Sequence, residues 1–274
     1  MTKQTTFIAA LLACHNRREK TAACLRSLRN QDHLTDLGIK VLALLVDDGC
    51  TDGTVDTALT IWPEAKIIPG DGNLYWCGGM RKAWANAAST EPDYYLLLND
   101  DTVLYPTALS TLLAMCPTPD TPVIAVGAIC DPETKQWVYG GNQSDYPFVC
   151  GADKPRPCRT MNANCTLVPR AVYRKIGMFH HAYRHAMGDT DYGLEASRRG
   201  VVIFESSSFV GECEANPETN SWRDTTLPRM TRWRKLTSVK GLPPKDWLHF
   251  CKRNCGALWW RYWLSPYFRV LLGR

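Results

Sequence analysis

The chain has 274 residues, of which 45% are hydrophobic and 22% charged, and its formal net charge is +5. This composition is typical of a globular protein and excludes a collagen, a coiled coil or a wholly disordered chain. The length allows one large domain or two small ones and is sufficient to bury a sizeable core.

Charge is distributed unevenly along the chain. Residues 217–274 hold 12 lysines and arginines against three acids, a balance of +9, whereas residues 1–216 carry 20 bases against 24 acids, a balance of −4. Six of the ten tryptophans also lie in residues 217–274. We therefore divide the chain into an acidic domain, residues 1–216, and a basic, tryptophan-rich C-terminal extension, residues 217–274. A basic segment of this kind usually faces an anionic partner.

Targeting signals and disulfides are not expected. The chain lacks a run of about 18 apolar residues. Polar residues from His15 to Arg18 interrupt the N-terminal apolar stretch where a secretory signal would need its cleavage site. We therefore expect a cytoplasmic protein. Its 12 cysteines are scattered without the spacing of a zinc ribbon, so we expect them to be mostly reduced and structural.

Apolar runs alternate with helical patterns through the first hundred residues. Strands are expected at 6–13, 39–46, 65–68 and 94–98, helices at 18–30, 54–61 and 80–88, and a glycine-rich loop at 70–79. Because parallel strands need helical crossovers, this order predicts an α/β fold with a mostly parallel, Rossmann-like sheet flanked by helices. Ligands of such sheets bind at the carboxyl ends of the strands.

The pattern changes after residue 130. Residues 137–150 are rich in glycine and tyrosine and predict a hairpin or flap. Strands are expected at 161–168 and 201–204, and helices at 170–176 and 189–199. The basic extension is expected to be helical.

Acidic residues follow two of the expected strands. Asp100 and Asp101 are adjacent, and paired carboxylates are usually neutralised by a cation, for which all-oxygen ligands favour Mg²⁺ or Mn²⁺. A plain strand-end turn, with Asp101 capping the next helix, is the alternative. Asp47 and Asp48 end an earlier strand, where a carboxylate either binds a nucleoside or simply forms a turn.

Five segments together resemble glycosyltransferase family 2, the inverting nucleotide-sugar transferases of the glycosyltransferase-A fold. They are L-A-C-H-N-R at 12–17, V-D-D-G-C-T-D-G-T at 46–54, N-L-Y-W-C-G-G-M at 73–80, L-N-D-D at 98–101 and G-D-T-D-Y-G-L at 188–194. The resemblance extends from about residue 7 to residue 210. It implies the activity of that family and a nucleoside-diphosphate sugar as donor.

The resemblance implies roles for individual residues. Asp101 would bind a divalent cation, Mn²⁺ or Mg²⁺. Many relatives have a further histidine ligand, which Glu212 would replace here, unless it is simply a solvated or hydrogen-bonded acid of the loop. Asp47 would hold the base or ribose of the nucleotide. The donor-binding set is completed by Asn16, Arg17, Asp48, Asn73, Gly78, Gly79, Arg81, Asn99 and Asp100.

Asp189 is the candidate catalytic base by resemblance, with Asp191 orienting the acceptor or supporting the start of the helix. The family often has Glu before this Asp, whereas the chain has Gly188, so the two roles could be reversed. Both acids would also favour a helix N-terminus in the absence of any catalytic role. His181 and His185 are four residues apart without a third metal ligand, which favours acceptor contact or a surface position over zinc.

The extension offers two interpretations. Tryptophan, tyrosine and basic side chains suit the inner surface of a membrane and a lipid-linked acceptor. The same residues could instead pack on the catalytic domain or form a homodimer interface. No nucleic-acid module accompanies them. The resulting hypothesis is a transferase acting on a saccharide or lipid-linked acceptor in bacterial cell-surface polysaccharide synthesis. The rivals are a sugar-phosphate nucleotidyltransferase and a non-catalytic saccharide-binding or scaffold protein.

Overall fold

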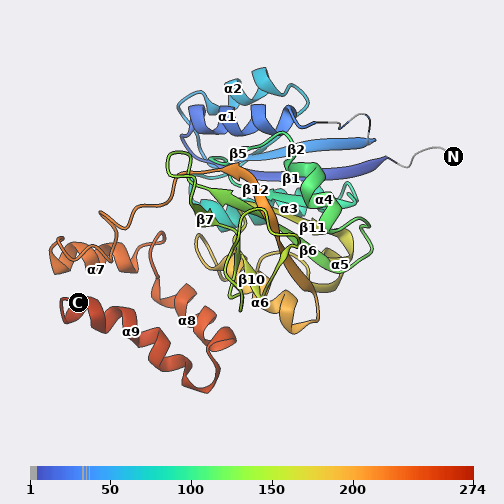
Figure 1. Cartoon of the computed structure of the whole chain (residues 1–274). Coiled ribbons are helices and arrows are strands. Elements are labelled where there is room, and N and C mark those ends of the chain that lie inside the picture. Colours follow the sequence, from blue (N-terminus) through green and yellow to red (C-terminus); the bar gives the residue numbers. More distant parts are fainter. Residues whose placement is uncertain (1–4, 33, 35, 37) are drawn as a thin grey trace.

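A ten-stranded mixed sheet forms the centre of the protein (Figure 1). The structure is a computed structural model that describes residues 5–32, 34, 36 and 38–274. Eight strands follow one another across the sheet in the order β3-β2-β1-β4-β11-β6-β12-β5, while β7 pairs with β6 and β9 with β12.

The first half of the sheet is parallel, as predicted. It contains β3 (Lys66–Pro69), β2 (Ile39–Asp47), β1 (Thr6–Cys14) and β4 (Tyr94–Leu98). Residues 8–12 of β1 are fully buried, as expected for a continuous apolar strand covered on both faces. The register places Cys14 beside Asp47, so that β1 and β2 end at the same edge of the sheet.

The second half of the sheet is mixed. Strand β11 (Cys165–Pro169) is antiparallel to β4 and to β6 (Val123–Cys130), whereas β12 (Val202–Glu212) is parallel to β6. The short strands are β5 (Val103–Leu104), β7 (Trp137–Tyr139) and β9 (Arg156–Cys158), and β8 (Gly141–Asn142) pairs with β10 (Thr160–Met161) in a separate ribbon. The single strand expected at 161–168 is therefore two strands, and the last strand is longer than expected.

Helices cover both faces of the sheet (Figure 1). Helices α1 (Arg18–Arg29), α2 (Thr54–Ile61) and α4 (Ala108–Met115) enclose one hydrophobic core. Helices α3 (Tyr75–Ala88), α5 (Arg170–Ile176) and α6 (Gly188–Arg198) enclose the other, in which the fully buried Trp84 packs among aromatic rings.

The glycine-rich loop expected at 70–79 is wrong in its second half, because helix α3 begins at Tyr75 and includes Gly78 and Gly79. A Cβ at Gly79 would lie 2.7 Å from the Cβ of Ala13, so glycine allows the helix to pack directly on β1. Glycine disfavours helix in an isolated sequence. Here the contact with the sheet outweighs that preference.

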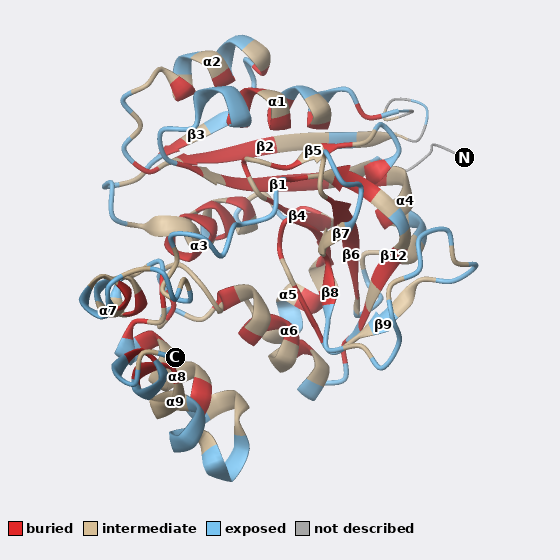
Figure 2. Ribbon diagram, turned by 60° about the vertical axis from the view of Figure 1, so that its left-hand side comes forward, coloured by how far each residue is buried: buried red, intermediate tan, exposed pale blue. Residues whose placement is uncertain are grey.

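The C-terminal extension forms a helical layer beside the sheet and its covering helices (Figures 1 and 2). It contains α7 (Arg229–Thr237), α8 (Pro244–Asn254), a 3₁₀ turn (Gly256–Leu258) and α9 (Trp259–Leu271). A small core of its own is centred on Leu236, Tyr267 and Val270, against which four of its tryptophans pack. None of the helices in the described part of the chain is long and apolar enough to cross a membrane.

Candidate active site at the carboxyl edge of the sheet

A cavity of about 400 Å³ lies where β1, β2 and β4 end and α3 begins. Its walls therefore come from segments that are distant in the sequence. They are formed by Ala13, Cys14, His15, Arg17, Asp48, Gly72, Tyr75, Trp76, Asp100, His185 and Lys240.

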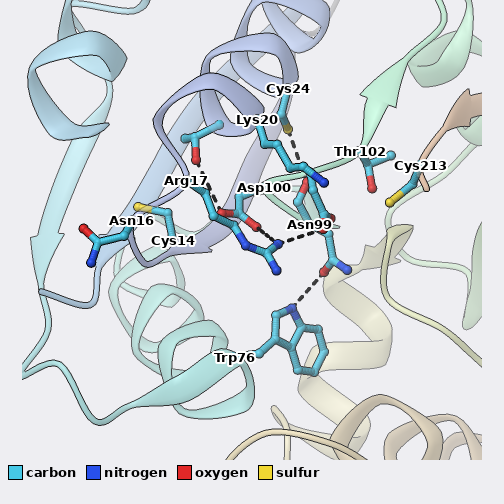
Figure 3. Close-up of polar contacts among 12 residues, drawn as sticks. Cys14, Asn16, Arg17, Lys20, Cys24, Trp76, Asn99, Asp100, Thr102 and Cys213 are labelled. Carbon is cyan, nitrogen blue, oxygen red and sulfur yellow. Dashed lines mark hydrogen bonds and ion pairs between the residues drawn. The ribbon is translucent and has the colours of Figure 1, made fainter. Parts of the chain in front are cut away.

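An arginine bridges the two acids that follow β4. Arg17 Nη1 lies 3.2 Å from Asp100 Oδ1, a contact drawn in Figure 3, and 2.7 Å from Asp101 Oδ2. Asp100 is 6% exposed and also accepts a hydrogen bond from the hydroxyl of Thr21 at 3.4 Å. Burial raises the pKa of Asp100 to about 6, although the neighbouring Arg17 opposes this shift. The sequence analysis assigned these three residues to the donor and metal site without predicting their mutual contact, and their roles there stay predictions.

One oxygen of Asp101 suits a cation. Among the described residues, its buried Oδ1 atom has no hydrogen-bond partner, while Oδ2 is paired with Arg17. Buried polar atoms are nearly always satisfied, so an isolated carboxylate oxygen beside a second carboxylate indicates a missing partner. Hard divalent cations prefer such oxygen ligands. The donor set therefore fits Mg²⁺ or Mn²⁺.

Asn99 connects the acidic edge to helix α3. Its Oδ1 atom accepts a hydrogen bond of 2.8 Å from the indole Nε1 of Trp76, a contact visible in Figure 3. Trp76 lines the cavity. Asn99 consequently positions an aromatic wall of the site, and its side-chain oxygen is already used within the protein.

Asp48 fixes the start of α3. Its carboxylate accepts backbone N–H groups from Gly72 at 2.9 Å, Leu74 at 3.2 Å and Tyr75 at 2.9 Å. A carboxylate that receives several N–H groups at a helix start satisfies donors that would otherwise be unpaired. Asp48 lines the cavity, but these bonds make it chiefly a residue that shapes the loop.

Asp47 and Asn16 stabilise the neighbouring turn. Asp47 Oδ1 accepts the N–H of Cys50 at 2.7 Å, and Asn16 Oδ1 accepts the N–H of Thr51 at 2.7 Å. Neither residue is among those lining the cavity in the described structure. Their predicted contact with the nucleotide stays a prediction.

Two cysteines join Asp47 at the base of the site, a grouping that the sequence analysis missed. The sulfur atoms of Cys14 and Cys50 are 3.6 Å apart. One ligand atom from each of Cys14, Asp47 and Cys50 lies within 4.8 Å of the others. Burial raises the pKa of both thiols, which keeps them protonated. The paired ends of β1 and β2 explain why residues so far apart in the sequence meet.

The two predicted catalytic acids have different surroundings. Asp189 accepts N–H groups from Thr190 at 2.7 Å and Ala163 at 3.3 Å, and burial raises its pKa against these hydrogen bonds. Asp191 is 2% exposed and accepts bonds from Arg253 Nε at 3.0 Å and Asn254 Nδ2 at 2.7 Å. Asp191 thus joins α6 to α8, a partner set that the sequence did not reveal.

Three predicted residues form contacts away from the cavity walls. Arg81 donates to the carbonyls of His180 and Tyr183, so its guanidinium is occupied by the backbone. Glu212 pairs with Lys135 at 2.8 Å, and its role as a metal ligand stays a prediction. Asn73 is exposed and bonds within its own turn.

His185, which was expected at the surface or on the acceptor side, lines the cavity. Its ring lies 6.3 Å from that of Tyr75, and its Nδ1 atom is buried without a partner among the described residues. Burial, together with the charges of Lys240 and Arg17, lowers the pKa of His185 to about 4, so the ring is neutral near pH 7. His181 instead stacks on His180 with a centroid distance of 4.3 Å.

Three non-glycine residues with left-handed backbone conformations lie in or next to the segments that line the cavity. The φ angles of Asn16, Tyr75 and Met187 are 51°, 55° and 71°. Such conformations cost on the order of 1 kcal/mol or more outside glycine and accumulate at functional sites. The three residues lie directly before Arg17, at the first residue of α3 and directly before α6.

A half-parallel sheet with acids at the ends of its strands and a cavity at that edge defines an α/β fold whose ligand site lies at the carboxyl ends of the strands. The sequence profile of glycosyl transferase family 2 matches residues 10–177. The chain belongs to glycosyl transferase family 2, which confirms the resemblance drawn from the five segments. A search of curated protein sequences found no match.

Solved structures share the fold at low sequence identity. The mannosyltransferase PcManGT of Pyrobaculum calidifontis, solved with GDP-Man and Mn²⁺, is 12% identical with a TM-score of 0.59, and the match covers 97% of this chain and 70% of that one. TarS 1–349 of S. aureus, solved with UDP-GlcNAc, is 12% identical with a TM-score of 0.61, and the match covers 97% and 81%. These neighbours confirm the predicted glycosyltransferase-A fold.

Proposed function

We propose that the protein is an inverting, metal-dependent glycosyltransferase that moves a sugar from a nucleoside-diphosphate sugar to a hydroxyl group of a saccharide or lipid-linked acceptor. The observation that carries this proposal is the acidic edge of the cavity, where Arg17 contacts Asp100 and Asp101 and one oxygen of Asp101 lacks a partner. Structural neighbours solved with GDP-Man and Mn²⁺ or with UDP-GlcNAc support a nucleotide-sugar donor.

Asp101 and Asp100 would hold the divalent cation, Mn²⁺ or Mg²⁺. When bound, this cation would neutralise the charge that develops on the diphosphate leaving group. The side chain of Arg17 is 48% exposed, so it is free to turn from the acids towards a phosphate. Arg17 would thereby exchange one anionic partner for another as the donor enters.

Asp189 would act as the general base for the acceptor hydroxyl. Its raised pKa gives the carboxylate a higher proton affinity than a solvated aspartate, which suits proton abstraction. Attack from the face of the sugar opposite the diphosphate would invert the anomeric centre, as a carboxylate base does in inverting glycosidases. The contacts of Asp191 with Arg253 and Asn254 favour a structural role for that residue.

Family membership favours this function over a sugar-phosphate nucleotidyltransferase. A non-catalytic scaffold would not need to keep metal-binding aspartates. The presence of both Asp100 and Asp101 therefore favours an enzyme. We further propose a cytoplasmic enzyme of bacterial cell-surface polysaccharide synthesis. Exposed apolar residues of α9, together with the excess of basic residues in the extension, support contact with the inner surface of a membrane.

A thermal-shift screen tests the donor and the metal together. UDP, dTDP and GDP sugars should raise the melting temperature of the wild type in the presence of Mn²⁺, because a ligand that binds only the folded state stabilises it. Asp101→Asn should lose the Mn²⁺-dependent part of the shift and metal-dependent turnover. Glu133→Gln, on an exposed turn, is the matched control. An unchanged response of Asp101→Asn would contradict the metal assignment.

A further inference from the structure

The C-terminal extension contributes one cation to the wall of the cavity. Lys240 lines the cavity from the loop between α7 and α8, whereas the other lining residues all precede residue 186. Lys240 is exposed, and among the described residues its ammonium group has no hydrogen bond or ion pair. A charged group that faces a cavity without a partner is available to an anionic ligand.

The loop that carries Lys240 is held in place by specific contacts. The N–H of Leu242 donates to the carbonyl of Leu236 at 2.6 Å, and the hydroxyl of Tyr267 donates to the carbonyl of Leu242 at 2.7 Å. A Cβ at Gly241 would lie 2.5 Å from the carbonyl oxygen of Leu236, so only glycine fits this turn. The backbone beside Lys240 is therefore fixed, while its side chain remains free to adjust.

Contacts from the extension continue directly to the cavity. The guanidinium of Arg184 pairs with the buried Asp246 of α8 at 3.4 Å. The carbonyl of Arg184 accepts the N–H groups of Cys77 and Gly78, at 3.0 and 3.2 Å, in the first turn of α3. The next residue, His185, lines the cavity. The extension, this segment and the start of α3 thus form one connected wall.

The cavity walls carry charges of both signs. Asp100 lies on the acidic edge beside Asp101, whereas Lys240 lies close enough to His185 for its charge to lower the pKa of that ring. Because His185 is neutral, Lys240 and Arg17 are the positive groups near it. A ligand with adjacent negative charges would interact favourably with both a cation held at the acidic edge and the free ammonium group of Lys240.

We propose that Lys240 binds the diphosphate of the nucleotide-sugar donor, so that the C-terminal extension completes the donor site. This inference rests on the proposed function. A lysine suits the role because its ammonium is a compact charge with three donors on a flexible stem, which can follow a phosphate as the donor enters and leaves. The family model matches residues 10–177, so Lys240 lies outside the part of the chain that it covers.

Calorimetric titration of the full chain tests the inference. UDP, dTDP and GDP, each with Mn²⁺, and the matching nucleosides are titrated into the wild type, Lys240→Gln, Lys240→Arg and Lys245→Gln. Lys245 is an exposed lysine of α8 that lines a different cavity, so it controls for the loss of one positive charge. The melting temperature of each variant verifies its fold.

We expect Lys240→Gln to weaken diphosphate binding by roughly tenfold, the loss typical of one charge-assisted hydrogen bond. Nucleoside binding should be unchanged, Lys240→Arg should regain most of the affinity, and Lys245→Gln should bind like the wild type. Diphosphate affinity of Lys240→Gln within twofold of the wild type, or equal losses for nucleoside and diphosphate, would overturn the inference.

Failure of the proposed function gives a different result. In that case the wild type itself binds none of the three diphosphates, and the assignment of Lys240 falls with the donor site. If the wild type binds the diphosphates and Lys240→Gln binds them equally well, the proposed donor site is retained and only the role of the extension in it is rejected.

Discussion

Two titratable residues of the cavity have pKa shifts with opposite consequences for stability. The pKa of His185 falls from 6.5 to about 4, and that of Asp100 rises from 3.8 to about 6. Between pH 4 and 6 the unfolded chain therefore binds a proton at His185 that the folded protein excludes. Over the same range the folded protein binds a proton at Asp100 that the unfolded chain releases. The two contributions partly cancel in the wild type.

Single substitutions should separate these contributions. The stabilising contribution of neutral His185 is complete above pH 6.5 and is lost as the pH falls towards 4, by on the order of 1–3 kcal/mol. We expect His185→Gln to reduce the dependence of the unfolding free energy on pH in this range. Urea unfolding at several pH values measures the difference from the wild type. A constant difference between pH 4 and 6.5 would refute the shift.

Asp100→Asn should change the same profile in the opposite direction. The contribution of Asp100 to stability is greatest below pH 3.8 and is lost as the pH rises through about 6, because ionisation of a buried carboxyl is unfavourable. The variant should therefore gain stability relative to the wild type as the pH rises from 4 to 7. Asp145→Asn, on the surface, is the control. A relative loss over this range would contradict the direction of the shift.

At the scale of single residues, sequence patterns predicted which chemical groups lie near the cavity better than they predicted which residues contact one another. Asp100, Asp101 and Arg17 meet because they follow the adjacent strands β4 and β1, which end at one edge of the sheet; the sequence predicted roles for these residues but not this contact. Arg81 was assigned to the donor-binding set, and the structure shows that its guanidinium donates to backbone carbonyls, so its contact with the donor stays a prediction. A sequence shows which group is present, but the tertiary contacts decide which partner it finds.

Helices and strands were predictable wherever the apolar pattern was continuous. Helix α2 and strand β4 have the expected bounds, because hydrophobic periodicity and flanking turn residues agree there. The start of α3 was missed because Gly78 and Gly79 lower its helical propensity. Asp48 accepts backbone N–H groups at that turn, and Gly79 packs on Ala13. Both contacts stabilise the turn, and both join residues that are distant in the sequence.

The two glycines of α3 provide a test of this explanation. A Cβ at Gly79 would lie 2.7 Å from that of Ala13, whereas one at Gly78 would meet Leu74 Cβ at an ordinary 3.4 Å. Gly79→Ala should therefore destabilise the protein by about 1–3 kcal/mol through overpacking. Gly78→Ala should be neutral or stabilise it by up to about 1 kcal/mol through helix propensity. Chemical denaturation compares the pair, and equal effects would contradict the proposed packing.

At the scale of the whole molecule, the division at residue 217 stays a prediction, but the contacts between the two parts are specific. The basic residues 217–274 form helices beside the sheet, and Asp191 and Asp246 of the two parts pair with Arg253 and Arg184 across the boundary. Packing thus explains four tryptophans of the extension. The position of Lys240 in the cavity could not be predicted, because it depends on how the extension docks.

Helix α9 leaves an apolar and basic surface that packing does not explain. Trp260, Tyr262 and Phe268 of α9 and Leu272, which directly follows it, are 46%, 56%, 54% and 64% exposed. Cationic side chains of the same helix include Arg269. Aromatic residues next to basic ones favour the interface of an anionic bilayer, where both apolar burial and headgroup attraction contribute.

Replacement of the exposed apolar residues tests the membrane contact without removing the extension. The double variant Phe268→Glu, Leu272→Glu should lose sedimentation with vesicles that contain phosphatidylglycerol, because it removes apolar contact and adds negative charge. Tyr146→Glu, at a site 62% exposed on the catalytic domain, should bind like the wild type. Rising salt should weaken wild-type binding, since the headgroup attraction is screened. If the double variant binds vesicles normally but changes the oligomeric state in sedimentation velocity, the surface of α9 contacts a second copy of the chain instead.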